Sequence, residues 1–213
     1  MDATLLVELL TEELPPKALK DLSDVFSSKL FFDLQKDRFL ADGSAVSALA
    51  TPRRLAILIT KTKNQSADTE RDVQGPPVTA AAQAVMGFAK KNGIAVEALK
   101  KQPGPKGDIY VAHVSVKGQA LADVLAAKVE AALKALPIPK VMRWGSGEAQ
   151  FVRPVHGLVM LHGSKIVPGT VLGLQSGNKT RGHRFMGKGE IVLANADEYE
   201  KKLLEGSGVA SFE

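Results

Sequence analysis

The sequence contains no cysteine among its 213 residues. Disulfide bonds, zinc sites built on thiolates and cysteine nucleophiles are therefore excluded, and a reducing compartment suits such a chain. The amino-terminal segment shows no signal peptide, because the acid Asp2 stands where such peptides carry bases. Its apolar run is also too short to cross a bilayer. We therefore expect a cytoplasmic protein that makes no contact with a membrane.

The motifs of the best understood catalytic and nucleotide sites are missing as well. The chain has no G-x-x-x-x-G-K-[ST], no G-x-G-x-x-G after a strand, no H-E-x-x-H and no G-x-S-x-G. His156 and His162 fall in an expected strand, where a rise of roughly 3.4 Å per residue separates them by about 20 Å. They cannot share a metal ion, so we expect them to hydrogen-bond within a sheet. The sequence predicts no catalytic residue, no metal site and no cofactor for this chain.

Charge is present but unevenly distributed. Apolar residues make up 45% of the chain and charged residues 24%, which is typical of a globular protein. The net charge of +5 and the pI near 9.3 favour anionic partners only modestly. The segment 140–188 holds eight Lys or Arg against one acid, whereas residues 1–50 carry nine acids against five bases. The positive field is therefore regional.

Apolar periodicity predicts an α+β fold with mixed, mainly antiparallel sheets and packed helices. The chain begins as a β-α-β-β unit: a buried strand over 4–10, a helix entered at Pro15-Pro16 that ends near Lys36, and strands over 45–50 and 53–60. The second of these two strands is apolar on both faces, so we expect it inside a sheet.

Composition suggests where domains meet. Residues 1–63 form the β-α-β-β unit, and the polar stretch 64–78, which ends in Gly-Pro-Pro, is expected to be an exposed loop or linker. Residues 79–213 form an α+β region that could share one fold with 1–63. In that region we expect helices over 79–91, 119–136 and 197–204, a turn over 102–108, a loop over 175–188, and strands over 108–116, 151–161, 165–174 and 191–193, with a hairpin turn at 162–164.

The stretch RGHRFM, residues 181–186, concentrates hydrogen-bond donors. Arg181 and Arg184 flank a flexible Gly182, and their guanidinium groups match the geometry of phosphate. His183 adds a further donor. Alternatively, these arginines pair with carboxylates of the acidic first region or bind carbonyls at strand ends. A phosphate-ester enzyme is less favoured, since no carboxylate pair or metal ligand set accompanies them.

Two other stretches carry arginine. In LPIPKVMRWG, residues 136–145, we expect Lys140 and Arg143 at the surface and Trp144 in the core. In TPRRLA, residues 51–56, Arg53 and Arg54 must point to opposite faces of a strand. At most one of that pair can belong to a given site.

Six stretches, taken in order, resemble the beta subunit of bacterial glycyl-tRNA synthetase, and the resemblance covers essentially the whole chain. They are VELLTEELPPKAL at 7–19, TPRRLA at 51–56, GPP at 75–77, LPIPKVMRWG at 136–145, FVRPVHGLVMLHG at 151–163 and RGHRFM at 181–186.

This resemblance implies an aminoacyl-tRNA synthetase of α2β2 composition. Its alpha subunit would carry the class II site that activates glycine with ATP and Mg, and its beta subunit would supply most of the tRNA(Gly) binding. Beta subunits of the family are longer and carry an HD-type domain and an anticodon-binding domain, so the chain is expected to be an amino-terminal fragment. The corresponding region has been compared with tRNA-binding modules of archaeal CCA-adding enzymes, which implies contact with the acceptor end.

Together these observations predict a noncatalytic segment that supports tRNA(Gly) binding and glycylation. The expected backbone-contacting residues are Lys140, Arg143, Arg153, Arg181, His183 and Arg184. The alternative is a structural or subunit-interface segment without direct tRNA contact, in which RGHRFM holds a protein carboxylate or a neighbouring loop.

Overall fold

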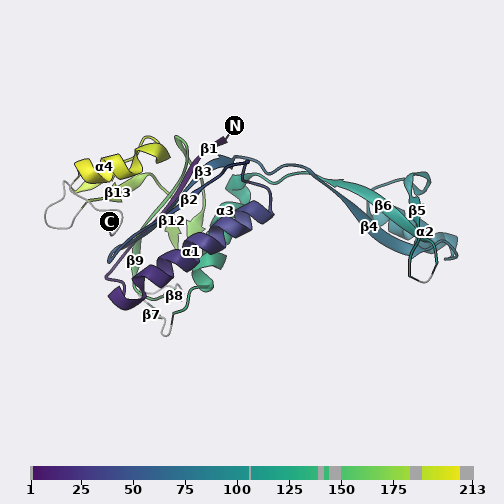
Figure 1. Cartoon of the computed structure of the whole chain (residues 1–213), viewed down its shortest axis with the longest axis horizontal. Coiled ribbons are helices and arrows are strands. Elements are labelled where there is room, and N and C mark those ends of the chain that lie inside the picture. Colours follow the sequence, from purple (N-terminus) through teal and green to yellow (C-terminus); the bar gives the residue numbers. More distant parts are fainter. Residues whose placement is uncertain (1, 106, 139–141, 144–149, 183–188, 207–213) are drawn as a thin grey trace. The chain divides into compact units, whose positions relative to one another are not determined.

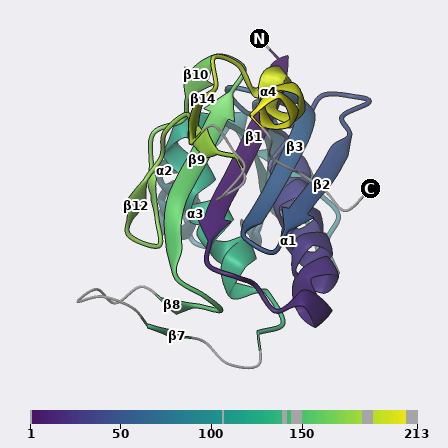
Figure 2. The same ribbon diagram turned by 90° about the vertical axis from the view of Figure 1, so that its left-hand side faces the viewer.

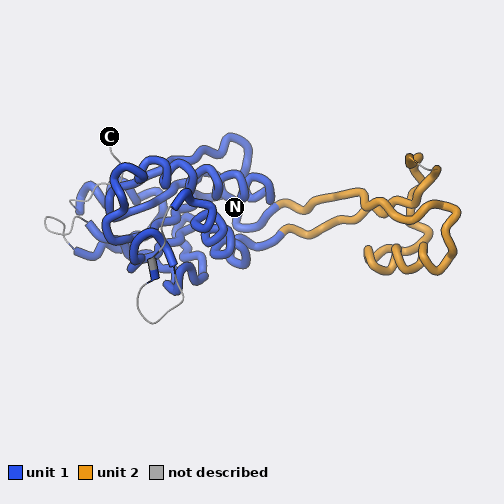
Figure 3. Tube along the Cα trace, turned by 90° about the horizontal axis from the view of Figure 1, so that it is seen from below, with its two compact units in different colours: residues 1–66, 119–213 blue, residues 67–118 orange. Residues whose placement is uncertain are grey.

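The computed structural model describes residues 2–105, 107–138, 142–143, 150–182 and 189–206. The architecture is α+β, as predicted, and divides into two compact units (Figure 3). Unit 1 comprises residues 1–66 and 119–213, and unit 2 comprises residues 67–118. The second unit is thus inserted into the sequence of the first, an arrangement that differs from the boundaries expected at 63 and 78. Among the described helices, none has the length and apolarity needed to span a membrane.

Unit 1 is built on a five-stranded antiparallel sheet with the strand order β10-β9-β1-β3-β2 (Figure 1). Its strands are β1 (Asp2–Thr11), β2 (Val46–Thr51), β3 (Arg54–Lys63), β9 (Val155–His162) and β10 (Lys165–Ile166). Helix α1 (Pro16–Lys36) lies between β1 and β2 in the sequence, which confirms the predicted β-α-β-β start. Strand β3 lies inside the sheet, also as predicted.

Both faces of this sheet are covered (Figure 2). Helices α1 and α3 (Leu121–Lys134) pack on one face, where the α1 stripe of Leu19, Leu22, Phe26 and Leu30 is fully buried. The opposite face carries a smaller apolar cluster that includes Leu6, Ala56 and Tyr199. It is covered by β13 (Lys179–Arg181), β14 (Glu190–Val192), η2 (Ala196–Glu198) and α4 (Tyr199–Glu205).

The predicted long strands after residue 150 are interrupted. The expected strand 151–161 consists of two strands separated by Pro154: β8 (Gln150–Phe151), which pairs with β7 (Met142–Arg143), and β9. The expected strand 165–174 is split twice. The first break is at Pro168, since proline cannot donate to a ladder, and the second is at a turn in which Leu172 and Gly173 have positive φ. The hairpin between β9 and β10 is confirmed. The remaining short strands are β11 (Thr170–Val171) and β12 (Leu174–Gln175).

Unit 2 is a three-stranded antiparallel sheet with the order β4-β6-β5 and one helix. Its elements are β4 (Thr69–Pro77), α2 (Ala82–Lys91), η1 (Val96–Ala98), β5 (Lys100–Gln102) and β6 (Ile109–Val116). The loop expected over 64–78 is therefore mostly a strand. Its side chains are exposed or half-buried, so the sequence lacks the apolar alternation that marks a strand, and pairing with the distant β6 forms it instead. Helix α2 begins three residues later than expected, and Thr79 does not cap it.

Candidate nucleic-acid interface

Several arginines gather at the end of the sheet where β1 finishes. Leu10 pairs with Arg54, and Thr11 pairs with Val155. The Thr11 N–H also donates to the Arg53 carbonyl at 3.0 Å. The chain segments around Arg53, Arg54 and Arg153 therefore meet at one end of unit 1, which we call the arginine end.

Arg53 and Arg153 hold the connection between β1 and α1. Arg53 forms ion pairs with Glu13 at 3.1 Å and with Glu12 at 3.7 Å. Arg153 donates from Nε to the Glu13 carbonyl at 3.0 Å and from Nη1 to the Val152 carbonyl at 3.2 Å. Exposed ion pairs of this kind contribute about 0–1 kcal/mol each. Their effect is to fix the entry into α1, so Arg153 has a structural role in addition to any contact with a partner.

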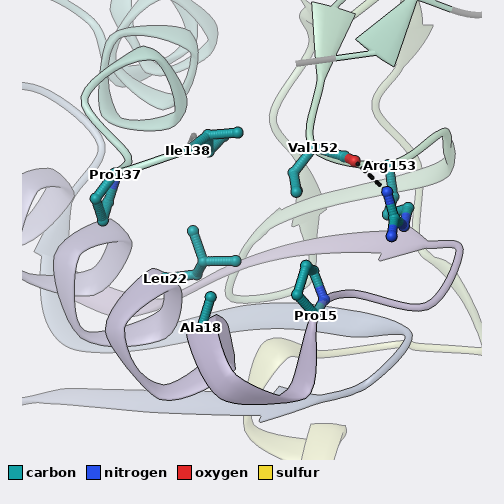
Figure 4. Close-up of a pocket in the computed structure, with 7 residues that line it drawn as sticks. All are labelled: Pro15, Ala18, Leu22, Pro137, Ile138, Val152 and Arg153. Carbon is teal, nitrogen blue, oxygen red and sulfur yellow. Dashed lines mark hydrogen bonds between the residues drawn. The ribbon is translucent and has the colours of Figure 1, made fainter. Parts of the chain in front are cut away.

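Beside this connection the surface has an apolar depression (Figure 4). Pro15, Ala18 and Leu22 of the α1 side face Pro137 and Ile138, which follow α3. Val152 and Arg153 complete the lining. The Arg153 side chain is the only charged group of this lining, and its hydrogen bond to the Val152 carbonyl keeps it at the edge.

Arg54 points to the other face, as strand alternation requires, and it is buried there with Glu8. Its Nε lies 3.0 Å from Glu8 Oε2, and the Tyr199 hydroxyl of α4 donates to the same oxygen. Burial raises the pKa of Glu8 above its ordinary 4.5, against the opposing effects of Arg54, Thr180 and Tyr199, which favour the charged carboxylate. Burial and the nearby Glu8 raise the pKa of Tyr199 well above 10, so the phenol keeps its proton at neutral pH.

This buried group is connected to strand β13. Arg54 Nη2 donates to the backbone carbonyl of Arg181. Along β13 the side chains alternate: Thr180 is fully buried toward Glu8, whereas Lys179 and Arg181 are exposed. The structure therefore fixes the backbone of Arg181 through the sheet and leaves its side chain at the surface. We call Glu8, Arg54 and Tyr199 the buried cluster.

The other predicted site residues are placed as follows. Arg143 is exposed on β7, where it pairs with Gln150 of β8. Arg153 lies at the arginine end on the side of α1, and Arg181 is attached to the same end on the side of α4. The structure thus brings Arg153 and Arg181 to one end of the sheet but on opposite faces. Lys140, Trp144, His183 and Arg184 lie outside the described residues.

The sequence pattern did not identify the buried cluster. The available signal is Glu8 itself, an acid inside the apolar run from Leu5 to Leu10, because a charge buried in a strand requires a partner. His162 bonds to the Thr62 carbonyl at 2.6 Å, which confirms its expected role within the sheet, whereas His156 is exposed. Within the described residues no group of three His, Cys, Asp or Glu side chains could hold a metal ion.

Comparison with known proteins identifies relatives over the whole chain. The family model of the glycyl-tRNA synthetase beta subunit matches residues 5–213. The glycine-tRNA ligase beta subunit of Neisseria meningitidis serogroup A is 46% identical over 219 residues, which cover 100% of this chain and 32% of that protein. The corresponding subunits of Aromatoleum aromaticum and Serratia proteamaculans are 46% and 42% identical, over 99% of this chain and 32% and 31% of theirs. The chain spans about a third of the length of these relatives.

Proposed function

The chain belongs to the glycyl-tRNA synthetase beta subunit family, and we propose that it is a noncatalytic segment of this ligase that binds tRNA(Gly). One observation carries the proposal. Strand β13 presents two cations at the surface, Lys179, which forms an ion pair with Glu190 at 2.9 Å, and Arg181, whose backbone carbonyl accepts a hydrogen bond from the buried Arg54. The segment 140–188, which contains this strand, carries eight bases against one acid.

The proposed contacts are to the RNA backbone. Lys and Arg dominate such contacts because phosphates supply the charge, and these contacts position an RNA without reading its sequence. The contacting residues of the proposal are Lys140, Arg143, Arg153, Arg181, His183 and Arg184. Of those that the structure describes, Arg143 and Arg181 are exposed, whereas Arg153 is half-buried and already donates to two carbonyls. We therefore expect Arg153 to contribute least to the free energy of RNA binding among these three arginines.

The relatives' name, beta subunit, implies an alpha subunit as partner. In the proposed assembly, an α2β2 heterotetramer in the cytoplasm, ATP and Mg act at the alpha subunit. This chain would contribute to holding the tRNA during glycylation and would contribute no reacting group.

A second candidate function is supported by the way the protein uses its own arginines. Arg53, Arg54 and Arg153 bind Glu8, Glu13 or their neighbours within unit 1. If the exposed cations Arg143 and Arg181 likewise bind protein carboxylates or carbonyls and not RNA phosphates, their surface contacts the alpha subunit without touching tRNA.

Salt dependence separates the two functions. We would measure binding of tRNA(Gly) to the chain across a salt series for wild type, Arg143→Ala/Arg181→Ala and the control Lys20→Ala/Lys201→Ala. The control removes two exposed lysines, each of which forms an ion pair with an acid of its own helix. It therefore lowers the net charge by the same two units as Arg143→Ala/Arg181→Ala. Loss of two phosphate contacts lowers the slope of log K against log salt by roughly 1.4 to 1.8, and the control leaves it near the wild-type value.

Two further results complete the test. Circular dichroism must show that all three proteins are folded. An unchanged salt slope in Arg143→Ala/Arg181→Ala contradicts the proposal, and weaker co-purification of that variant with the alpha subunit then supports the interface function.

A further inference from the structure

Strand β13 is outside the five-stranded sheet, and within the described residues it pairs only with β14. One end of this two-stranded element is attached through Gly177, whose N–H donates to the Leu158 carbonyl at 3.1 Å. The other end is attached through Arg54, which donates to the Arg181 carbonyl. In the part of the chain that the structure describes, no continuous ladder with β9 or β1 fixes its register, so the hydrogen bond from Arg54 sets where Arg181 lies relative to the sheet.

The Arg54 guanidinium is itself held in one orientation. Its Nε lies 3.0 Å from Glu8 Oε2 on β1 as an ion pair, and the Tyr199 hydroxyl of α4 donates to the same oxygen. A planar guanidinium fixed at one edge presents its other donors in a defined direction, which a lysine ammonium does not do. Glu8 and Tyr199 are completely buried, and Arg54 is 5% exposed. The Arg54 Nη2 donor therefore reaches the Arg181 carbonyl from the buried side of β13.

A buried ion pair does not by itself increase the free energy of unfolding. Apolar residues of similar volume often stabilise a protein equally well or better, because they avoid the desolvation of two charges. What the pair at Glu8 and Arg54 adds is a directed bond to the backbone of β13. Since side chains alternate along a strand, a fixed carbonyl at Arg181 also fixes Lys179 and Arg181 on the outer side.

We propose that Glu8 and Arg54 are positioning residues that orient β13 so that Arg181 contacts the RNA backbone. This inference rests on the proposed function and adds to it the two buried side chains that orient the contacting strand. Neither Glu8 nor Arg54 touches RNA in this arrangement.

The first test compares two variants of the buried cluster. Arg54→Lys keeps a positive charge beside Glu8, but one ammonium cannot replace both the ion pair with Glu8 and the hydrogen bond to the Arg181 carbonyl. Tyr199→Phe removes a bond to Glu8 and leaves the bond between Arg54 and Arg181 in place. Each variant is made with and without Arg181→Ala, and the salt slope of tRNA(Gly) binding is measured for all of them.

We expect Arg181→Ala to lower the slope by about 0.7 to 0.9 in the wild-type and Tyr199→Phe backgrounds. In the Arg54→Lys background the same substitution should lower the slope by less than half of that amount, because Arg181 is no longer aligned. A full effect of Arg181→Ala in Arg54→Lys overturns the positioning role.

The second test needs no RNA. Amide hydrogen exchange of 179–181 and 190–192 is compared in wild type and Arg54→Lys, and we expect about tenfold faster exchange there with little change in β1. If Arg54→Lys does not fold, Glu8→Gln/Arg54→Met removes the pair without leaving a buried charge and is measured instead. Unchanged exchange in the folded variant overturns the inference. Faster exchange together with an Arg181→Ala variant whose salt slope equals that of wild type supports the orientation of β13 by Arg54 and overturns the contact between Arg181 and RNA.

Discussion

The Tyr199 hydroxyl should contribute measurably to the stability of unit 1. It is completely buried and donates to a carboxylate oxygen of Glu8 that also forms an ion pair with Arg54. Tyr199→Phe removes one oxygen and leaves the ring in its apolar cluster. A hydrogen bond to a charged group contributes roughly 1.5–3 kcal/mol. At about 2–4 °C per kcal/mol for a unit of this size, the melting temperature should fall by roughly 3–12 °C.

The loss should also depend on pH. Because the pKa of Glu8 is raised in the folded protein, its contribution to stability is complete below the ordinary 4.5 and is lost as the pH rises through the raised value. The phenol favours the charged carboxylate, so Tyr199→Phe raises the pKa of Glu8 further. The free energy lost on substitution is therefore larger at pH 8 than at pH 4.

Urea unfolding of wild type and Tyr199→Phe at both pH values measures this difference. Tyr110→Phe is the matched control, since Tyr110 is the other tyrosine and lies on β6 of unit 2. A loss below about 0.5 kcal/mol, or a loss that is the same at pH 4 and pH 8, would refute the reasoning about the buried cluster.

Two predictions concern unit 2. Gly75→Ala would place a Cβ 2.5 Å from the Phe88 ring, so we expect unit 2 to lose about 1–3 kcal/mol of stability, measured by hydrogen exchange. Gly87→Ala is the control, because a Cβ there would meet no atom within 4 Å and stability should not fall. The pKa of His113 is raised above 6.5 chiefly by its hydrogen bond to Asp72, so the stabilising contribution of His113 is present below pH 6.5 and is lost above the raised pKa. An NMR titration of His113 should show a lower midpoint in Asp72→Asn than in wild type. An unchanged midpoint contradicts Asp72 as the cause of the raised pKa.

Local patterns in the sequence predicted the elements whose signal is contained within one segment. The stripe from Leu19 to Leu30 identified α1, and the alternation after Arg53 identified β3 with two buried faces. Opposite directions for Arg53 and Arg54 followed from the strand period alone and are confirmed by their separate carboxylate partners. Such features depend on neighbours a few residues away.

Features that depend on distant pairing were not predictable in this way. Strand β4 is polar and forms because β6, some forty residues later, pairs with it. The buried cluster joins Glu8 to Tyr199 across almost the entire chain, and a single sequence contains no local pattern that links those two positions. For the same reason the sequence could list the exposed cations but could not show which of them the protein already uses to bind its own backbone, as Arg153 does.

The insertion of unit 2 has a consequence for how the chain can be altered. The Ser66 N–H donates to the Gln119 carbonyl at 2.9 Å, and the Gln119 N–H donates to the Ser66 hydroxyl at 2.8 Å, so the two chain segments that lead into and out of unit 2 are hydrogen-bonded to each other. The neighbouring residues Gln65 and Ala120 also form an antiparallel bridge, so the two segments lie side by side there. We therefore expect that unit 2 can be excised and that a short turn can join Ser66 to Gln119, because the two ends of the insertion are already hydrogen-bonded to each other.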